Sequence, residues 1–315
     1  MKHPILGLHH VTATVNEAQP DLDFYADLLG LRLVKKTVNF DNHNVYHFYY
    51  GDERGTPGTL WTTFPYAGWG VAPGRHGEGQ ITTTSFSVPV HSLPWWTTRL
   101  LDRGVAIRES GTSAISFQDP SGLIIQLQGT VDDRRTPWSG SGITTDAAIR
   151  GLESVILTIA QPGPTVTLLT DLLGFTVTEQ NEHSVTLGVN GNEPGKTIRL
   201  RHGTGAPPAR NGLGTVHHVA LAIASGEEQL RLRSELVDLG MTVTPVLDRQ
   251  YFHSIYFREP GGVLLEVATV GPGFSIDEPV SDLGRELKLP PWEEAHRAAI
   301  EQALPPISLQ PLLRR

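Results

Sequence analysis

The sequence contains no cysteine among its 315 residues, which excludes disulfide bonds and thiolate metal sites. Any metal centre must therefore use nitrogen and oxygen ligands. The chain also lacks an apolar run of the roughly 18 residues that a membrane helix needs. Its first residues, MKHPILGLHH, lack a signal-peptide core followed by a cleavage site. We expect a cytoplasmic protein that does not associate with a membrane.

Charged residues are also scarce, at 18% of the chain, and the net charge is −8 without any basic stripe. A nucleic-acid partner is therefore not expected. Hydrophobic residues make up 39%, which is enough to bury real cores and argues against a disordered chain. The length suits two domains of ordinary size.

The chain repeats itself. GLHHVTATV, starting at Gly7, resembles GLESVILTI, starting at Gly151, 144 residues later. DLLGLRLV from Asp27 resembles DLLGFTVT from Asp171 at the same offset. Two further pairs match at offsets of 135 and 140: GQITTTSFSV with GTVHHVALAI, and QDPSGLIIQLQ with REPGGVLLEVA. Changes in loop length explain the difference between the offsets.

Each of the four units has the same order of elements. An alternating strand comes first, then a helical stretch that ends in a glycine, a common helix terminator. Short strands follow, and the Asp-Pro-Ser-Gly and Glu-Pro-Gly-Gly turns precede the last one. The pattern predicts an α+β fold of four βαβββ modules in two tandem domains. We place the domains at 1–138 and 147–272, with a polar linker between them. Residues 273–315 form a tail with one helix that packs on the second domain or on a partner subunit.

Two His-His pairs occupy the first strands of the first and fourth modules. Because side chains of a strand alternate between its faces, His10 shares a face with Thr12 and Thr14, and His218 with Ala220. These faces carry small side chains and should line a concave cavity. The same alternation predicts that His9 and His217 point toward the helices.

Glu266 stands in an otherwise apolar last strand, GGVLLEVA, on the face opposite Val267. A buried carboxylate needs a cation, hydrogen bonds or a metal. The repeats provide an internal control. The positions equivalent to His10, His218 and Glu266 in the other modules hold weak ligands: Ser154, Thr83, Gln126 and, at the end of the first module, Thr62. A purely structural role would require the same residue type in all modules.

One histidine in a strand is more often a hydrogen-bonded core residue than a ligand. Here three candidates fall at equivalent positions that face the cavity, which favours metal binding. Two histidines and one carboxylate form the facial triad of non-haem Fe(II) oxygenases. The remaining histidines without such support are interpreted as surface or loop residues: His3, His43, His76, His91, His183, His202 and His296.

Two further stretches are rich in aromatic and polar residues. DRQYFHSIYFREPGG precedes Glu266 and contains Arg249, Tyr251, His253 and Tyr256. Its tyrosines suit a structural and a functional role about equally, and Arg249 is most simply a solvated loop residue. NFDNHNVYHFYYGDERGTPGTLWTTFP, from Asn39, is more typical of hairpin core than of a substrate pocket.

The motifs GLHHVTA, LGLRLVKKTVNFD, VHHVAL and YFHSIYFREPGGVLLE, within four βαβββ units, resemble the ring-cleaving dioxygenases of the glyoxalase/bleomycin-resistance superfamily, whose fold is built from half-barrel sheets around a metal site. The resemblance is to the hydroquinone dioxygenase-like branch and covers about residues 4 to 285. It implies a metal triad of His10, His218 and Glu266. It further implicates His9, Arg249 and Tyr256 near the substrate, although strand alternation alone turns His9 away.

The resemblance implies an Fe(II)-dependent, extradiol-type ring-cleaving dioxygenase, with Mn(II) as the alternative metal. Its partners would be O₂ and a small hydroquinone- or catechol-like aromatic, and the sequence leaves a homo-oligomer open. One alternative is a glyoxalase-type lyase or isomerase, which usually needs a fourth protein ligand where this chain has Thr62. The other is a metal-free protein that sequesters an aromatic compound.

Overall fold

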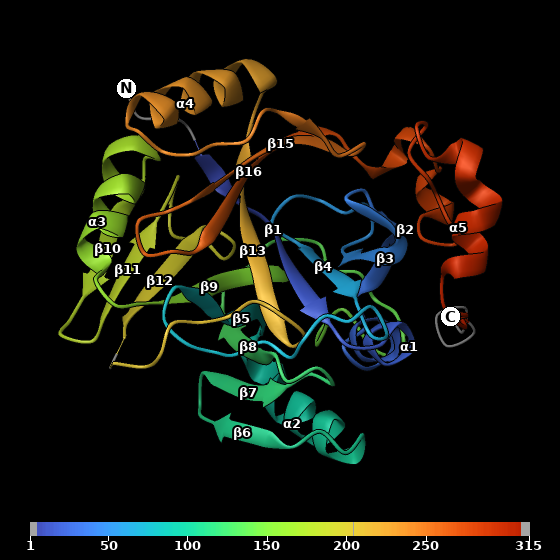
Figure 1. The fold of residues 1–315 in the computed structure, drawn as a ribbon. Coiled ribbons are helices and arrows are strands. Elements are labelled where there is room, and N and C mark those ends of the chain that lie inside the picture. Colours follow the sequence, from blue (N-terminus) through green and yellow to red (C-terminus); the bar gives the residue numbers. More distant parts are fainter. Residues whose placement is uncertain (1–4, 204, 310–315) are drawn as a thin grey trace.

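The computed structural model describes residues 5–203 and 205–309 (Figure 1). His3, interpreted above as a surface or loop residue, lies outside the described residues. So do the start of the predicted first domain (1–4) and the end of the predicted tail (310–315). The described chain is a mixed structure of strands and short helices arranged as four successive βαβββ modules, which confirms the predicted α+β fold.

The elements follow the chain in module order. The first module holds β1 (Ile5–Val15), α1 (Ala18–Leu22) continued by a π-helical segment (Asp23–Leu28), β2 (Arg32–Asn39), β3 (Asn42–Gly51) and β4 (Leu60–Pro65). The second holds β5 (Gln80–Pro89), α2 (Leu93–Asp102), β6 (Ile107–Ser110), β7 (Ala114–Gln118) and β8 (Ile124–Thr130). The third holds β9 (Gly151–Ile159), α3 (Pro162–Thr167) with a π-helical segment (Leu168–Leu172), β10 (Thr176–Gln180), β11 (Ser184–Gly188) and β12 (Thr197–His202). The fourth holds β13 (Thr215–Ile223), α4 (Gly226–Asp238), β14 (Leu247–Asp248), β15 (Phe252–Arg258) and β16 (Leu264–Pro272). The tail contains α5 (Arg297–Ala303).

Glycines end the helical stretches as the sequence predicts. The four glycines concerned have φ values from 69° to 81°, a left-handed conformation that costs a glycine little. They are Gly30, Gly104, Gly174 and Gly240.

The strands of the described residues form two eight-stranded sheets, and each sheet joins modules from opposite halves of the sequence. The first has the order β14-β15-β16-β13-β1-β4-β3-β2, and the second has the order β10-β11-β12-β9-β5-β8-β7-β6. Strand β1 pairs antiparallel with β13, more than 200 residues away, and β5 pairs with β9. The first and fourth modules therefore share one sheet, and the second and third share the other. The division into domains at 1–138 and 147–272 stays a prediction. Its boundary differs from that of the sheets, because each sheet contains strands of both predicted domains.

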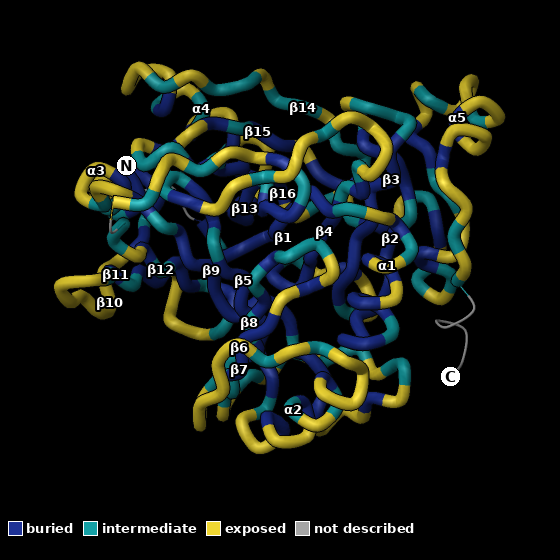
Figure 2. Tube along the Cα trace, turned by 60° about the horizontal axis from the view of Figure 1, so that its bottom comes forward, coloured by how far each residue is buried: buried dark blue, intermediate teal, exposed yellow. Residues whose placement is uncertain are grey.

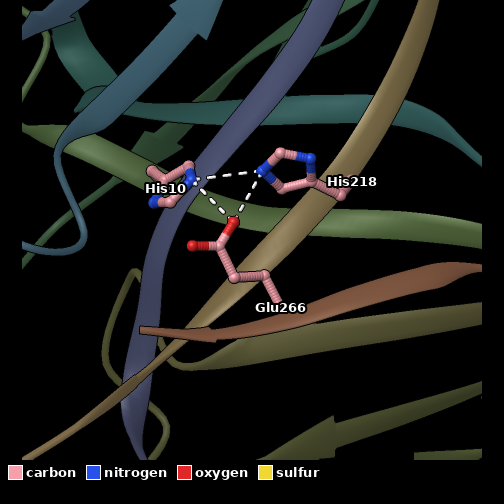
Figure 3. Close-up of side chains that lie close together, drawn as sticks. All are labelled: His10, His218 and Glu266. Carbon is pink, nitrogen blue, oxygen red and sulfur yellow. Dashed lines mark hydrogen bonds and ion pairs between the residues drawn. The ribbon is translucent and has the colours of Figure 1, made fainter. Parts of the chain in front are cut away.

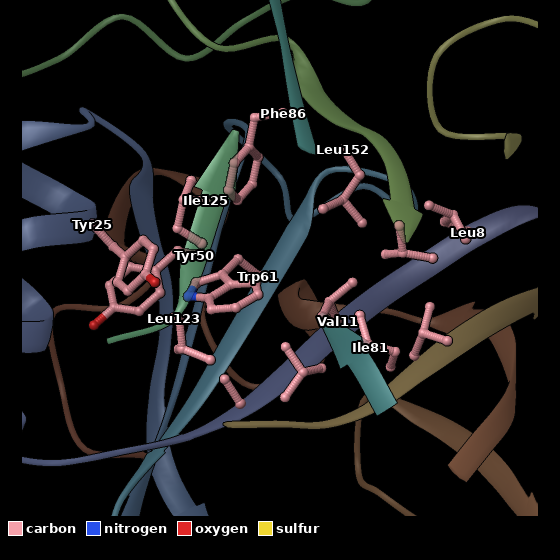
Figure 4. Packing of buried hydrophobic residues seen from close by; sticks show 14 of the residues in the cluster. Leu8, Val11, Tyr25, Tyr50, Trp61, Ile81, Phe86, Leu123, Ile125 and Leu152 are labelled. Carbon is pink, nitrogen blue, oxygen red and sulfur yellow. The ribbon is translucent and has the colours of Figure 1, made fainter. Parts of the chain in front are cut away.

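A continuous apolar core connects the two sheets (Figure 4). Val11 of β1 and Trp61 of β4 belong to the first sheet, and Phe86 and Leu152 belong to the second; all four are fully buried. The buried residues gather on the central strands and on α1, whereas many loops and the outer strands β6 and β10 are exposed (Figure 2). Because Val11 faces this core, the opposite face of β1, which carries His10, is free to form a site.

The tail is attached to the first sheet by a buried ion pair. The ammonium group of Lys35, on β2, lies 2.6 Å from a carboxylate oxygen of Asp277 and also contacts Glu278. Tyr251 donates a hydrogen bond of 3.0 Å to Asp277. These contacts fix the tail beside the strands that carry the site. No helix among residues 5–203 and 205–309 is long and apolar enough to cross a membrane.

One carboxyl group, that of Asp21 on α1, is buried in the core. It accepts hydrogen bonds from the hydroxyls of Tyr50 (2.7 Å) and Thr63 (2.6 Å). Burial raises the pKa of Asp21 from its ordinary 3.8 to about 8; these two hydroxyls oppose the rise and nearby Asp119 adds to it. The folded chain therefore keeps a proton on Asp21 at neutral pH, whereas the unfolded chain loses it.

This difference predicts a pH-dependent effect of Asp21→Asn. Because the pKa of Asp21 is higher in the folded chain than in the unfolded chain, its protonated form contributes to the stability of the fold. This contribution is complete below about pH 3.8 and is lost as the pH rises to about 8. Asparagine stays neutral at every pH. The free energy of unfolding of the variant, relative to that of the wild type, should therefore rise by more than about 1 kcal/mol from pH 5 to pH 9. Urea unfolding at both pH values measures the gain. The exposed Asp238→Asn should show none, and an equal change in both variants would contradict the assignment.

Candidate metal centre

His10, His218 and Glu266 come together on the concave face of the first sheet (Figure 3). They lie on three adjacent strands, β1, β13 and β16. The Nε2 atoms of the histidines are 3.3 Å apart, and Oε2 of Glu266 lies 3.2 Å from His10 Nε2 and 2.8 Å from His218 Nε2. All three side chains are buried. Within the described parts of the chain, they form the one cluster of three residues with the donor spacing of a metal site.

The spacing of the three donor atoms fits a transition-metal ion. Ligands about 2.1 Å from a metal and at right angles to each other lie about 3.0 Å apart, and the three distances here scatter around that value. Oε2 of Glu266 is fully buried and faces the Nε2 atoms of His10 and His218, so three donor atoms point to one place that a cation would occupy. The residues present therefore suit a facial His-His-Glu metal centre.

Neighbouring groups keep Glu266 ionised. Burial by itself raises its pKa, but the adjacent His10 and His218 outweigh burial and hold the pKa of Glu266 well below its ordinary value. Its other oxygen accepts a hydrogen bond from the hydroxyl of Ser254 on β15. The carboxylate is thus charged and fixed in orientation, as a metal ligand must be.

The predicted orientation of His9 and His217 is wrong, and β-bulges explain why. In the pairing of β1 with β13, Leu8 lies opposite Leu221 and His10 opposite Ala220, so His9 is an extra residue. Further along, Thr12 lies opposite His218 and Ala13 opposite Val216, so His217 is extra on the other strand. A bulged residue escapes the simple alternation of faces. Each extra histidine therefore turns beside its neighbour instead of toward a helix.

The bulged histidines contact His10 and His218 directly. Nδ1 of His9 lies 2.9 Å from Nδ1 of His10, and Nδ1 of His217 lies 2.7 Å from Nδ1 of His218. Burial, and then the neighbouring ligand histidine, lowers the pKa of His9 and of His217 to about 3. A neutral ring can accept a hydrogen bond, so each bulged histidine can hold the ligand's proton on Nδ1 and leave its Nε2 free to coordinate.

His10 and His218 line a cavity of about 200 Å³, while Glu266 is fully buried behind them. His10, His218 and His217 form one side of it. The remaining walls are mostly aromatic and small polar side chains of β1, β3, β4 and β15: Thr12, Thr14, His47, Tyr49, Phe64, Phe252 and Tyr256, with Asn39, Phe40, Asp41, Tyr66 and Arg249 completing the lining. An aromatic cavity with a few polar groups is typical of a site for a small organic ligand.

Arg249 and Tyr256 lie side by side in this lining, so Arg249 is not the solvated loop residue that the sequence most simply suggests. Nε of Arg249 donates a hydrogen bond of 3.2 Å to the Tyr256 hydroxyl, and its Nη2 lies 3.1 Å from Asp41. Burial, followed by the charge of Glu266, raises the pKa of Tyr256, although Arg249 opposes the shift. Tyr256 is therefore a protonated phenol that faces the metal centre.

Sequence reasoning missed His47, which lies in the stretch interpreted mainly as hairpin core. The stretch serves both roles: Phe48 and Tyr50 face the core, while His47 and Tyr49 line the cavity. Thr62, the counterpart of Glu266, hydrogen-bonds to Nε2 of His47 at 3.0 Å and to Thr12 at 2.8 Å. The alternation YHFYY already separates the two faces and could have identified His47.

The corresponding positions in the second sheet do not form such a centre. Thr83 on β5, Gln126 on β8 and Ser154 on β9 lie on its three adjacent central strands, in the same relative order as the ligands of the first sheet. The hydroxyl of Ser154 hydrogen-bonds to Glu153. The fold is thus repeated, whereas the strong donor set belongs to the first sheet.

The class of protein follows from this fold and this centre. The family model for the Glyoxalase/Bleomycin resistance protein/Dioxygenase superfamily matches residues 7–127 and 151–267, and the chain belongs to this superfamily. The match confirms the resemblance seen in the sequence motifs.

Individual relatives cover nearly the whole chain. MhqE of Bacillus subtilis (strain 168), provisionally named a ring-cleaving dioxygenase, is 41% identical over 304 residues, which span 95% of this chain and 98% of MhqE. The chlorohydroquinone/hydroquinone 1,2-dioxygenase of Sphingobium indicum is 35% identical over 303 residues, or 91% of this chain and 92% of that protein.

Solved structures agree on the fold. A Bacillus subtilis crystal structure, provisionally titled a dioxygenase, superposes with a TM-score of 0.91 at 38% identity and covers 98% of this chain and 99% of that one. Glyoxalase I from Zea mays superposes with a TM-score of 0.62 at 14% identity, over 84% of this chain and 92% of that one. The second likeness bears on the fold alone.

Proposed function

We propose that this chain is an Fe(II)-dependent, extradiol-type ring-cleaving dioxygenase that acts on a hydroquinone- or catechol-like aromatic compound. The observation that carries the proposal is the convergence of His10, His218 and Glu266 on one buried point that opens into an aromatic cavity. Relatives that are named ring-cleaving and hydroquinone dioxygenases, at 35–41% identity over nearly the whole chain, support the reaction type.

The ligands leave room for the reactants. When ferrous iron is bound by three residues on one side, its chemistry is that of a Lewis acid with open positions for a hydroxylated ring and O₂. Phe252 and Phe64 of the cavity wall exclude water and offer aromatic faces to a ring. The protein's contribution is to hold both reactants next to each other.

Tyr256 and Arg249 are proposed to handle protons. Tyr256 keeps its proton on Oη because burial and Glu266 raise its pKa. Arg249 stays cationic, since Tyr256 and Asp41 outweigh the effect of burial on its pKa. Their hydrogen bond points the phenol of Tyr256 into the cavity, so that it can donate a proton to an oxygen atom that becomes negative. His9 is proposed to act through His10 by fixing its tautomer.

Thr62 argues against a glyoxalase-type lyase or isomerase. Such an enzyme would need a strong fourth ligand at this position, and the Thr62 hydroxyl already bonds to Thr12 and His47. A thiol-adduct assay with added nickel or zinc tests this alternative. The other alternative, a metal-free protein that sequesters an aromatic compound, predicts that the purified protein contains no metal and that His10→Ala leaves its affinity for the aromatic ligand unchanged.

The proposal is tested on protein purified without air. Metal analysis should find about one iron per chain, and O₂ uptake should begin when substituted hydroquinones or catechols are added. Which of the two metals, iron or manganese, supports O₂ uptake is decided by reconstituting the protein with each metal separately. Absence of both metals together with no uptake for any of these compounds would refute the proposal.

Metal binding should also stabilise the fold. A ligand present at 100 times its dissociation constant stabilises the folded state by about 2.7 kcal/mol. Anaerobic addition of Fe(II) should therefore raise the melting temperature of the metal-free protein by several degrees, as measured by differential scanning calorimetry. His218→Ala should show no such rise, because only two ligands remain. An equal rise in both proteins would mean that iron binds elsewhere.

A further inference from the structure

His47 occupies the wall of the cavity that lies across from the metal ligands. Glu266, His218 and His10 lie on β16, β13 and β1, and the sheet continues through β4 to β3, which carries His47. Neighbouring strands are about 4.8 Å apart, so β3 lies roughly two strand spacings from β1. The cavity extends between them, and His47 is part of its lining.

The orientation of the His47 ring is fixed from several directions. Its centroid lies 4.0 Å from that of Tyr49 and 4.3 Å from that of Phe64. Nε2 is engaged by the Thr62 hydroxyl at 3.0 Å, the one hydrogen bond of this side chain among the described residues. Burial, and then the neighbouring His10 and His218, holds the pKa of His47 well below its ordinary value, so the ring is neutral. Nδ1 remains for a ligand.

The repeat relates this contact to the metal centre. Tyr256 lies opposite Glu266 in the pairing of β15 with β16, and Tyr49 lies opposite Thr62 in the pairing of β3 with β4. Ser254 and His47 each precede these tyrosines by two residues, and each hydrogen-bonds to the residue at the ligand position. The β15–β16 pair of the fourth module thus contributes the carboxylate of Glu266 to the site, and the equivalent β3–β4 pair of the first module contributes the neutral imidazole of His47.

The size of the cavity limits what lies between the two halves. A cavity of about 150 Å³ accommodates benzene, so a cavity of about 200 Å³ suits one ring with small substituents. A ring that places one hydroxyl at the metal centre directs a group on its far side toward β3. Vicinal hydroxyls of a catechol would both lie at the metal end.

We propose that His47 selects para-dihydroxylated single rings by hydrogen-bonding through Nδ1 to the hydroxyl remote from the metal centre. A hydroxyl both donates and accepts, so this contact forms with either tautomer of a neutral His47. The inference rests on the proposed function, because it assumes that an aromatic ring binds at the His-His-Glu centre.

The test compares binding of three small probes to the iron-loaded protein without O₂, by isothermal titration calorimetry. Hydroquinone has the remote hydroxyl, phenol lacks it, and catechol carries its second hydroxyl beside the first. The wild type should bind hydroquinone roughly tenfold more tightly than phenol, the value of one hydrogen bond. In His47→Phe, which keeps a ring between Tyr49 and Phe64, this ratio should fall to about one while phenol affinity changes little.

Two conservative variants separate the nitrogens of His47. Asparagine places its amide near the position of Nδ1 and should retain part of the preference for hydroquinone. Glutamine reaches the position of Nε2, keeps the contact with Thr62, and should behave like His47→Phe. His253→Gln, at an exposed histidine of β15, should match the wild type. Glutamine also provides a test if the phenylalanine variant does not fold.

The outcomes distinguish this inference from the proposed function. A tenfold ratio that survives in His47→Phe and His47→Gln, or equal losses for hydroquinone and phenol, would overturn the role of His47 while oxygen uptake by the wild type still supports the dioxygenase. If the wild type binds none of the probes and consumes no O₂ with them, the proposed function itself fails.

Discussion

Replacing Glu266 by glutamine is expected to abolish iron binding and oxygen uptake. Glutamine keeps the shape of the side chain but removes the charge that faces the two Nε2 atoms. Removing one partner of a buried ionic interaction costs about 3–5 kcal/mol, which corresponds to a loss of metal affinity of roughly a hundred- to several-thousandfold. Iron per chain after gel filtration, and the rate of O₂ consumption, measure the loss.

A matched control for this variant exists in the same module. Glu259 is also a buried carboxylate, but it accepts hydrogen bonds from Thr165 and from the backbone of its own turn. Glu259→Gln should lower the unfolding free energy and leave the iron content unchanged. If Glu266→Gln kept its iron, or if both variants lost iron equally, Glu266 would not be a ligand.

Replacing Tyr256 by phenylalanine is expected to slow turnover while iron stays bound. The substitution removes the proton on Oη and the acceptor of the Arg249 hydrogen bond, but leaves the triad intact. Loss of a general acid typically costs a factor of about 10² to 10⁴ in rate. Steady-state oxygen uptake should show the decrease in kcat, with a smaller change in KM.

Tyr46→Phe is the comparison for this result. Tyr46 lies on β3, stacks on Phe48 and is not part of the cavity lining, so kcat should be unchanged. Iron content and melting temperature should agree between the two variants and the wild type. A kcat of Tyr256→Phe equal to that of Tyr46→Phe would remove Tyr256 from the proton transfer.

The sequence was sufficient to predict the modules and the three residues whose donor atoms converge. Approximate repeats revealed four βαβββ units, and comparison between equivalent positions separated His10, His218 and Glu266 from Ser154, Thr83 and Gln126. Such a comparison works because all modules share the same structural demands, so a difference between them indicates function. The prediction of a shared site required the donor atoms of His10, His218 and Glu266 to lie close together, and they do.

The orientation of His9 and His217 could not be predicted in the same way. Each is the extra residue of a β-bulge, and a bulge is defined by the partner strand. The partner of β1 is β13, in the other half of the sequence, whereas repeats suggest pairing between neighbours. The position of Arg249 was obscured for a related reason, because it forms an ion pair with Asp41, which a distant hairpin brings beside it.

The pairing of β1 with β13 has a consequence for synthesis of the protein. His10 is synthesised more than 200 residues before His218 and Glu266, the two residues that converge with it. Long-range strand pairing of this kind is slow and must wait for the distant segment. During translation β1 therefore lacks its antiparallel partner until β13 has been made, and the donor atoms of His10, His218 and Glu266 can come together only after β16 has followed.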